Sequence, residues 1–148
     1  MKQIDQILLN VTKLGIDTAP LIYFVEHHPK YLDLVRQFMR QVDMGGIMAY
    51  SSVITLTETL PYPKRLNQTD VEREYRQLLL NSRNFELLPI DATIAEHAAE
   101  LRTRYTMRTP DALQIAAVLS VNCEAFLTND KRLKQVTELR VIVLDDLL

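Results

Sequence analysis

The stretch Leu14-Gly15-Ile16-Asp17-Thr18-Ala19-Pro20 joins a short apolar run to a helix start through a single carboxylate. Residues 14–16 predict a buried strand, and Pro20 suits the first turn of a helix that continues over residues 21–26. In an open α/β sheet the working groups gather at the carboxyl ends of the strands. Asp17, which directly follows the predicted strand, is therefore a candidate site residue.

The same alternation of apolar run and helical segment recurs along the chain. Further strands are expected at residues 47–50, 85–90, 123–127 and 141–144, with helical periodicity between them. Strands that alternate with helices predict an α/β fold with a central parallel sheet of about five strands and helices on both faces. The 148 residues fit a single domain, 1–148, in which residues 1–12 form either an extra N-terminal helix or a tail.

Three local patterns around the middle of the chain make sharper predictions. Ser51 or Ser52 can cap the helix that carries Glu58. Pro61-Tyr62-Pro63 breaks that helix, so residues 61–65 are expected to form a loop. Thr69-Asp70-Val71-Glu72 has the spacing of a capping box and predicts a helix start at that point.

Charge and cysteine content restrict the classes of function. The formal net charge of −2 argues against binding of nucleic acid through a broad positively charged surface. Any phosphate backbone would therefore be held by local basic clusters and a metal ion. The single Cys123 forms no internal disulfide, and the sequence has no zinc-type Cys/His spacing. The apolar residues among 4–11 are too few and too interrupted for a signal peptide or a membrane span. We therefore expect a soluble cytoplasmic protein with no membrane partner.

Four carboxylates lie directly after or just beyond apolar stretches: Asp17, Glu58, Asp111 and Asp130. Parallel strand ends meet at one edge, so these acids are expected to converge on one crevice. Two unit negative charges about 5 Å apart repel each other by roughly 3 kcal/mol at an effective dielectric constant of about 20. Four such groups therefore call for a cation or raised pKa values. Oxygen ligands favour Mg²⁺ or Mn²⁺ over zinc.

Each of these acids also has a purely structural explanation. Asp17 can form an Asx turn at a strand end, and Glu58 can be a solvated residue on an amphipathic helix. Asp111 follows Pro110 in a first helical turn, where a negative charge complements the helix dipole. Asp130 can cap a short helix that begins at the next residue.

The four acids occur in motifs that resemble the PIN-domain family of metal-dependent ribonucleases, and within it the VapC-like toxins of bacterial toxin-antitoxin pairs. The resemblance covers residues 14–143. One departure is Ala19, since the family often has a polar residue at this position. The similar segments, in order, are Ile16-Asp17-Thr18-Ala19-Pro20-Leu21-Ile22-Tyr23, Ser52-Val53-Ile54-Thr55-Leu56-Thr57-Glu58, Thr109-Pro110-Asp111-Ala112-Leu113-Gln114-Ile115-Ala116-Ala117 and Leu127-Thr128-Asn129-Asp130-Lys131.

This resemblance implies a Mg²⁺- or Mn²⁺-dependent endoribonuclease with an RNA substrate, a cognate antitoxin and a homodimeric state. Asp17 and Asp111 would be the principal metal ligands, and Glu58 and Asp130 would act directly or through water on the same or a second ion. Three residues are candidates to orient these ligands: Thr18, Thr128 and Asn129. Three more are candidate RNA contacts: Arg104, Arg108 and Lys131.

Two other interpretations compete with the nuclease. A phosphoryl-transfer domain fits poorly, because a receiver needs adjacent acids after the first strand, and an aspartyl phosphatase needs an aspartate where Ala19 stands. A non-catalytic PIN-like module that binds RNA or protein is the second alternative. Retention of all four acids argues against it, because like charges are costly to hold together without a cation.

Overall fold

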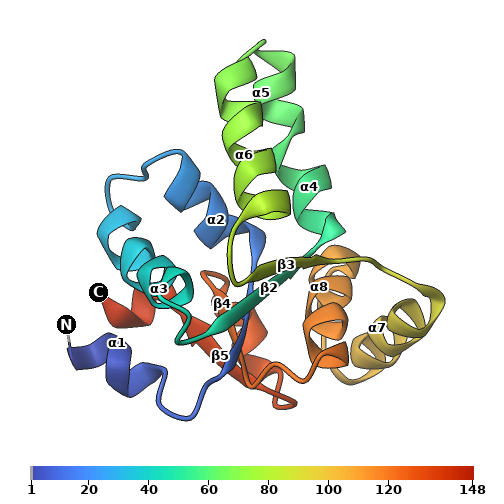
Figure 1. Ribbon diagram of the computed structural model, residues 1–148. Coiled ribbons are helices and arrows are strands. Elements are labelled where there is room, and N and C mark those ends of the chain that lie inside the picture. The colour runs from blue at the N-terminus through green and yellow to red at the C-terminus, as the bar shows by residue number, and fades with distance from the viewer. Residues whose placement is uncertain (1) are drawn as a thin grey trace.

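Five short strands form a single parallel sheet in the order β3-β2-β1-β4-β5 (Figure 1). The structure is a computed structural model that describes residues 2–148, so Met1 of the predicted 1–148 domain and 1–12 extension lies outside the described residues. The α/β fold and five-stranded parallel sheet predicted from the sequence are confirmed. The strands are β1 (Lys13–Ile16), β2 (Met48–Ser52), β3 (Phe85–Leu88), β4 (Ala125–Thr128) and β5 (Arg140–Val143).

The order of the strands reverses at the centre of the sheet. In β1, Leu14 aligns with Ala49 of β2 on one side and with Ala125 of β4 on the other. The chain therefore builds outward from β1 to β3 and then returns to add β4 and β5 on the opposite side. In doubly wound sheets the crevice at such a reversal is where ligands bind. Here it lies at the carboxyl ends of β1 and β4.

Alternate residues of the strands pack into two separate hydrophobic cores, one on each face of the sheet. Leu14 and Ile16 belong to one core, whereas Tyr50 and Phe126 belong to the other. This is the period of two that a strand imposes on its side chains. One face carries α1 (Lys2–Ile7), α2 (Thr18–Val25), α3 (Leu32–Asp43) and α6 (Thr69–Asn81), and the other carries α7 (Ala92–Arg104) and α8 (Thr109–Ser120).

The segment ahead of the first strand is helical and is anchored to the body of the protein. Helix α1 occupies Lys2–Ile7, and Ile4, Leu8 and Val11 are buried in the core of the first face. At the other end of the chain, two short 3-10 helices flank β5. They are η1 (Lys131–Gln135) and η2 (Leu144–Leu147). None of the helices in the part of the chain that the structure describes is long and apolar enough to cross a membrane.

Helices α4 (Val53–Thr59), α5 (Pro61–Arg65) and α6 form an arm that projects beyond the sheet (Figure 1). Ser52, rather than Ser51, caps α4 by accepting a hydrogen bond from the Ile54 N–H. The prediction of a loop at residues 61–65 is wrong. Pro61 ends α4 but also starts α5, because the first helical position needs no backbone N–H donor.

The capping box predicted at residues 69–72 is also absent. Helix α6 begins at Thr69, so its cap position is Gln68, which makes no side-chain cap hydrogen bond. The Glu72 carboxylate forms ion pairs with Lys64 at 3.1 Å and Arg76 at 3.2 Å. Through Lys64, Glu72 therefore links α6 to α5 across the arm. The two nearby cations compete with the backbone N–H that a capping box would use.

Candidate metal centre

A cavity of about 340 Å³ opens at the strand-order reversal, and all four predicted acids line it. Asp17 follows β1, Asp130 follows β4 by one intervening residue, Glu58 comes from α4 and Asp111 from the first turn of α8. An apolar patch from α2 forms another part of the wall. The lining residues are Asp17, Thr18, Ala19, Ile22, Tyr23, Glu58, Arg108, Asp111, Thr128, Asn129 and Asp130.

Asp17 is the most constrained of these acids. Its side chain caps α2 by accepting the Thr18 N–H at 2.8 Å, and the Thr128 hydroxyl donates to its other oxygen at 2.7 Å. Burial raises the pKa of Asp17 to about 6, and the negative charges of Asp111 and Glu58 act in the same direction, against the two hydrogen bonds. Asp17 therefore lies in a negative environment that favours a cation or a proton.

Glu58 is held at the cavity by the side chain that follows Asp17. The Thr18 hydroxyl donates to a Glu58 carboxylate oxygen at 2.6 Å. Thr18 therefore links two of the four acids, through its backbone N–H to Asp17 and through its hydroxyl to Glu58. The sequence nominated Thr18 as an orienting residue, and these two hydrogen bonds are the contacts by which it would do so.

A buried hydrogen-bond network lies beneath Thr18 and joins four elements, α2, β2, α4 and α8. The Gln114 amide of α8 donates to Thr55 at 2.9 Å and to Thr18 at 3.3 Å, and its carbonyl accepts from the Ser52 hydroxyl. Ser51 and Thr55 are hydrogen-bonded to each other at 2.8 Å. Within residues 2–148, buried side-chain nitrogen and oxygen atoms all have hydrogen-bond partners. The network thus fixes α2, α4 and α8 relative to one another at the base of the site.

Asp111 is paired with an arginine one turn earlier in the chain. The Arg108 guanidinium donates from Nε to Oδ2 at 3.1 Å and from a terminal nitrogen to Oδ1 at 3.3 Å. Both oxygens of Asp111 therefore have a partner. The neighbouring carboxylate raises the pKa of Arg108 still further, so the guanidinium stays charged.

Asp130 has a similar partner. It caps η1 by accepting the Arg132 N–H at 3.0 Å, and the Arg132 side chain donates to both carboxylate oxygens, at 3.0 and 2.8 Å. Arg132 holds the pKa of Asp130 below its ordinary value. Thr128 and Asn129 complete this loop: Thr128 accepts the Asp130 N–H, while Asn129 contacts the Tyr23 hydroxyl.

The chemical nature of the candidate ligands suits a hard divalent cation better than their present arrangement does. All candidate ligands are carboxylate or hydroxyl oxygens, as Mg²⁺ and Mn²⁺ prefer. Among residues 2–148, however, no three acidic, histidine or cysteine side chains are close enough to form a ready ligand group. Two of the four acids are engaged by arginines instead. Both arginine side chains are largely exposed, so they are free to move aside.

Two of the predicted RNA contacts lie outside the cavity lining. Arg104 pairs with Glu138 and Glu100 at the end of α7, and Lys131 is exposed at the start of η1. Arg108 alone of the three lines the cavity.

The sequence reasoning missed Gln114 and did not identify Arg132 as the partner of Asp130. Gln114 carried a usable signal, because it is a polar residue three positions after Asp111 in an otherwise apolar helix and so shares its face. Arg132 stands two positions after Asp130, but its spacing alone does not distinguish it from a solvated surface charge.

Comparison with known proteins agrees with this geometry. The family model described as PIN domain matches residues 15–139. No curated protein matches the chain significantly.

Similar solved structures include three bacterial complexes. The VapBC2 complex from Rickettsia felis bound to a promoter DNA fragment has a TM-score of 0.71 and 17% identity, over 89% of this chain and 98% of that one. A toxin-antitoxin complex from Klebsiella pneumoniae has a TM-score of 0.67 and 23% identity, over 88% and 97%. DNA-bound VapBC from Salmonella typhimurium has a TM-score of 0.62 and 19% identity, over 90% and 98%. At these identities the likeness establishes a shared fold.

Proposed function

The chain belongs to the PIN domain family, and from that premise we propose that it is a Mg²⁺- or Mn²⁺-dependent endoribonuclease, the toxin of a cytoplasmic toxin-antitoxin pair. The observation that carries the proposal is the convergence of Asp17, Glu58, Asp111 and Asp130 on one cavity at the strand-order reversal. These acids come from four separate parts of the chain, and simple capping roles do not require them to meet.

Asp17, Asp111 and Glu58 would hold the cation, with Asp130 on the same or a second ion. A divalent cation supplies a bound water of lowered pKa and offsets charge on the phosphodiester during in-line attack. The chain's own contribution is positional. Thr128 and the Thr18 N–H hold Asp17, and the Thr18 hydroxyl holds Glu58, so both carboxylates present fixed oxygens to the cavity.

Single-stranded RNA fits the cavity better than a duplex. The cavity is small, and its α2 wall of Ala19, Ile22 and Tyr23 is mostly apolar, which suits an unstacked base or ribose beside the reacting phosphate. The formal net charge of −2 gives no broad electrostatic surface for a long duplex. Specific contacts at the cavity would therefore select the substrate.

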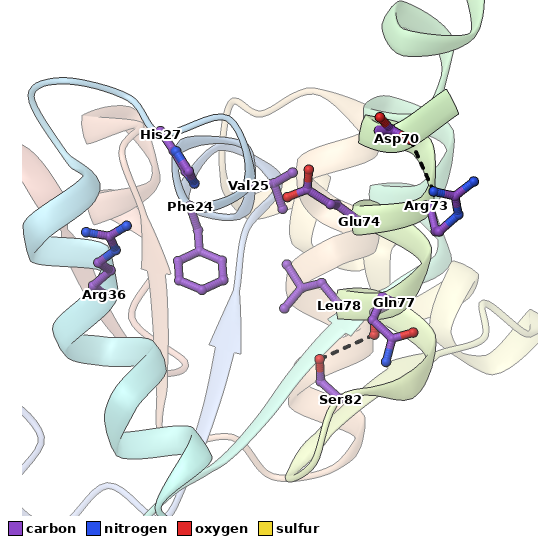
Figure 2. A pocket seen from close by; sticks show the side chains of 10 residues that line it. All are labelled: Phe24, Val25, His27, Arg36, Asp70, Arg73, Glu74, Gln77, Leu78 and Ser82. Carbon is purple, nitrogen blue, oxygen red and sulfur yellow. Dashed lines mark hydrogen bonds and ion pairs between the residues drawn. The ribbon is translucent and has the colours of Figure 1, made fainter. Parts of the chain in front are cut away.

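The antitoxin partner is supported by a second hollow and by the neighbours' assemblies. The similar structure from Klebsiella pneumoniae is described as a toxin-antitoxin complex, and those from Rickettsia felis and Salmonella typhimurium are described as VapBC2 and VapBC bound to DNA. In this chain a groove of about 600 Å³ runs between α2, α3 and α6. Figure 2 shows Phe24 and Leu78 facing each other across it, with Arg36, Arg73 and Glu74 around them. An apolar floor with a charged rim suits an amphipathic peptide segment.

One observation favours the non-catalytic alternative. Arg108 and Arg132 already neutralise Asp111 and Asp130, so a module that only binds partners has no need of a cation to keep these acids. The two functions differ in what the purified protein does to RNA.

The deciding experiment incubates the purified chain with a labelled single-stranded RNA pool in Mg²⁺, in Mn²⁺ and in excess EDTA. We expect endonucleolytic products with either metal and none with EDTA or with the Asp17→Asn variant. Cleavage that persists in EDTA and in the variant would point to a contaminant or another mechanism. Binding without cleavage in every condition would support the non-catalytic module.

A further inference from the structure

Two of the four cavity acids are occupied by guanidinium groups on both oxygens. Arg108 spans Oδ1 and Oδ2 of Asp111, and Arg132 spans the same pair of atoms on Asp130. Two parallel N–H donors on one carboxylate form the strongest type of ion pair that arginine makes. An ion that binds these oxygens must therefore displace or share the guanidinium.

The carboxylates and the guanidiniums differ sharply in exposure. The Asp111 and Asp130 side chains are 10% and 24% exposed, whereas those of Arg108 and Arg132 are 62% and 71% exposed. The acids thus form the floor of the site, and the arginines stand at its mouth. Each arginine is within three residues of its acid, so it stays near the cavity after the pair is broken.

A guanidinium released from a carboxylate has an obvious alternative partner in an RNA substrate. Its planar fork matches the oxygens of a phosphate as well as those of a carboxylate. An RNA strand that presents its phosphodiester to the cavity would lie beside Arg108, which lines the cavity, and near Arg132, which pairs with the lining residue Asp130. The same side chain can therefore serve the acid or the substrate, but not both at once.

We propose that Arg108 and Arg132 are exchangeable counter-ions, each of which leaves its aspartate when a divalent cation binds there and then holds an RNA phosphate at the mouth of the cavity. This inference rests on the proposed nuclease function and deepens it. Metal binding and RNA binding then favour each other, because the cation frees the arginine for the phosphate and the phosphate keeps the arginine away from the carboxylate. Neither residue takes part in the chemical step, so both are positioning residues.

The first measurement is the dissociation constant of Mn²⁺ by titration calorimetry without RNA. Because Arg108→Gln and Arg132→Gln each remove a competing charge, each should bind Mn²⁺ roughly three- to tenfold more tightly than the parent chain. The control is Arg83→Gln, which breaks an exposed ion pair of 3.5 Å with Asp43 outside this cavity. It should leave the Mn²⁺ affinity unchanged.

The second measurement is the affinity for a fluorescein-labelled single-stranded RNA dodecamer in Ca²⁺, followed by anisotropy over a range of salt concentrations. The same two variants should bind RNA more weakly, roughly three- to tenfold. The slope of log K against log salt should become shallower by about 0.7 for each lost phosphate contact. A purely structural role would not change this slope. Arg83→Gln again serves as the control.

The opposite signs of the two effects make the proposal falsifiable. Tighter Mn²⁺ binding together with weaker, less salt-dependent RNA binding supports it. Unchanged or weaker Mn²⁺ binding in Arg108→Gln and Arg132→Gln, or an unchanged salt slope, would overturn it even if the parent chain binds metal and cleaves RNA. Failure of the parent chain both to bind Mn²⁺ and to cleave RNA would instead remove the proposed function itself.

Discussion

At the scale of single residues, Asp17 combines a structural and a chemical role. It caps α2, yet burial and the nearby acids raise its pKa to about 6 from an ordinary 3.8. The folded state therefore binds this proton more tightly than the unfolded chain. The stabilisation that results is fully present below about pH 3.8 and is lost as the pH rises through about 6. At neutral pH without a cation, the Asp17 charge therefore costs stability.

Asp17→Asn is expected to abolish RNA cleavage and, in EDTA at pH 8, to raise the free energy of unfolding by up to about 3 kcal/mol. Asparagine is as good a helix cap as aspartate and lacks the charge. Urea unfolding at pH 4 and pH 8 measures the effect, and the gain should shrink at the lower pH. The control is Asp91→Asn, the same change at the exposed cap of α7. Its free energy of unfolding is expected to lie within about 0.5 kcal/mol of that of the parent. A variant less stable than the parent at pH 8 would contradict this account.

At the scale of elements, the site depends on how closely α8 approaches β1. A Cβ added at Gly15 would lie 2.8 to 2.9 Å from atoms of the Val118 side chain. Gly15 directly precedes the last residue of β1, and α8 carries both Asp111 and Gln114. The glycine thus sets the distance between the strand that positions Asp17 and the helix that positions Asp111.

Gly15→Ala is expected to lower the free energy of unfolding by about 1–3 kcal/mol, because overpacking pushes α8 away from the sheet. It should also weaken Mn²⁺ binding. Gly46→Ala is the control, since its added Cβ would meet atoms only at 3.6 Å. The double variant Gly15→Ala/Val118→Ala should recover much of the loss, as expected for residues in contact. Chemical denaturation of all four proteins tests this, and an undiminished stability of Gly15→Ala would exclude the close-approach explanation.

At the scale of the whole molecule, the arm formed by α4, α5 and α6 leaves apolar surface uncovered. Tyr62 and Leu66 are 56% and 49% exposed and lie four residues apart along the arm. By contrast, most apolar residues of α2 and α3 already belong to the core of the chain itself. We therefore place the predicted homodimer contact on the arm.

Light scattering at micromolar concentration should give twice the chain mass of 17.1 kDa. The double variant Tyr62→Glu/Leu66→Glu should shift the mass toward that of one chain, because two charges cannot be buried unpaired in an interface. Met44→Glu, at a residue 66% exposed away from the arm, should leave the dimer intact. A parent chain that scatters as a 17.1 kDa species would reject the dimer, and a dimeric double variant would reject the arm as its interface.

The fold class, the parallel sheet and the candidate acids could all be predicted from the order of the amino acids. Apolar periodicity and the acids that follow apolar runs are local patterns, and local chemistry decides them. Local patterns were less reliable at helix ends. The loop predicted at residues 61–65 proved to be a helix, and Glu72, expected in a capping box, forms ion pairs with Lys64 and Arg76 instead. At residues 61–65 the proline that ends one helix also starts the next, and at Glu72 the ion pairs with Lys64 and Arg76 outweighed the local preference.

The contacts between side chains at the site depend instead on tertiary packing. The hydrogen bond from Thr18 to Glu58 joins residues 40 positions apart, and that from Gln114 to Thr55 joins residues 59 apart. Such partners leave no mark on local spacing, because the order of strands and the packing of helices on the sheet bring them together. The arginines on Asp111 and Asp130 are near in sequence, but exposed pairs of this kind depend on how the cavity orients each carboxylate. The acids and the orienting residues Thr18 and Thr128 could therefore be named from the sequence, whereas the particular contacts that hold each acid could not.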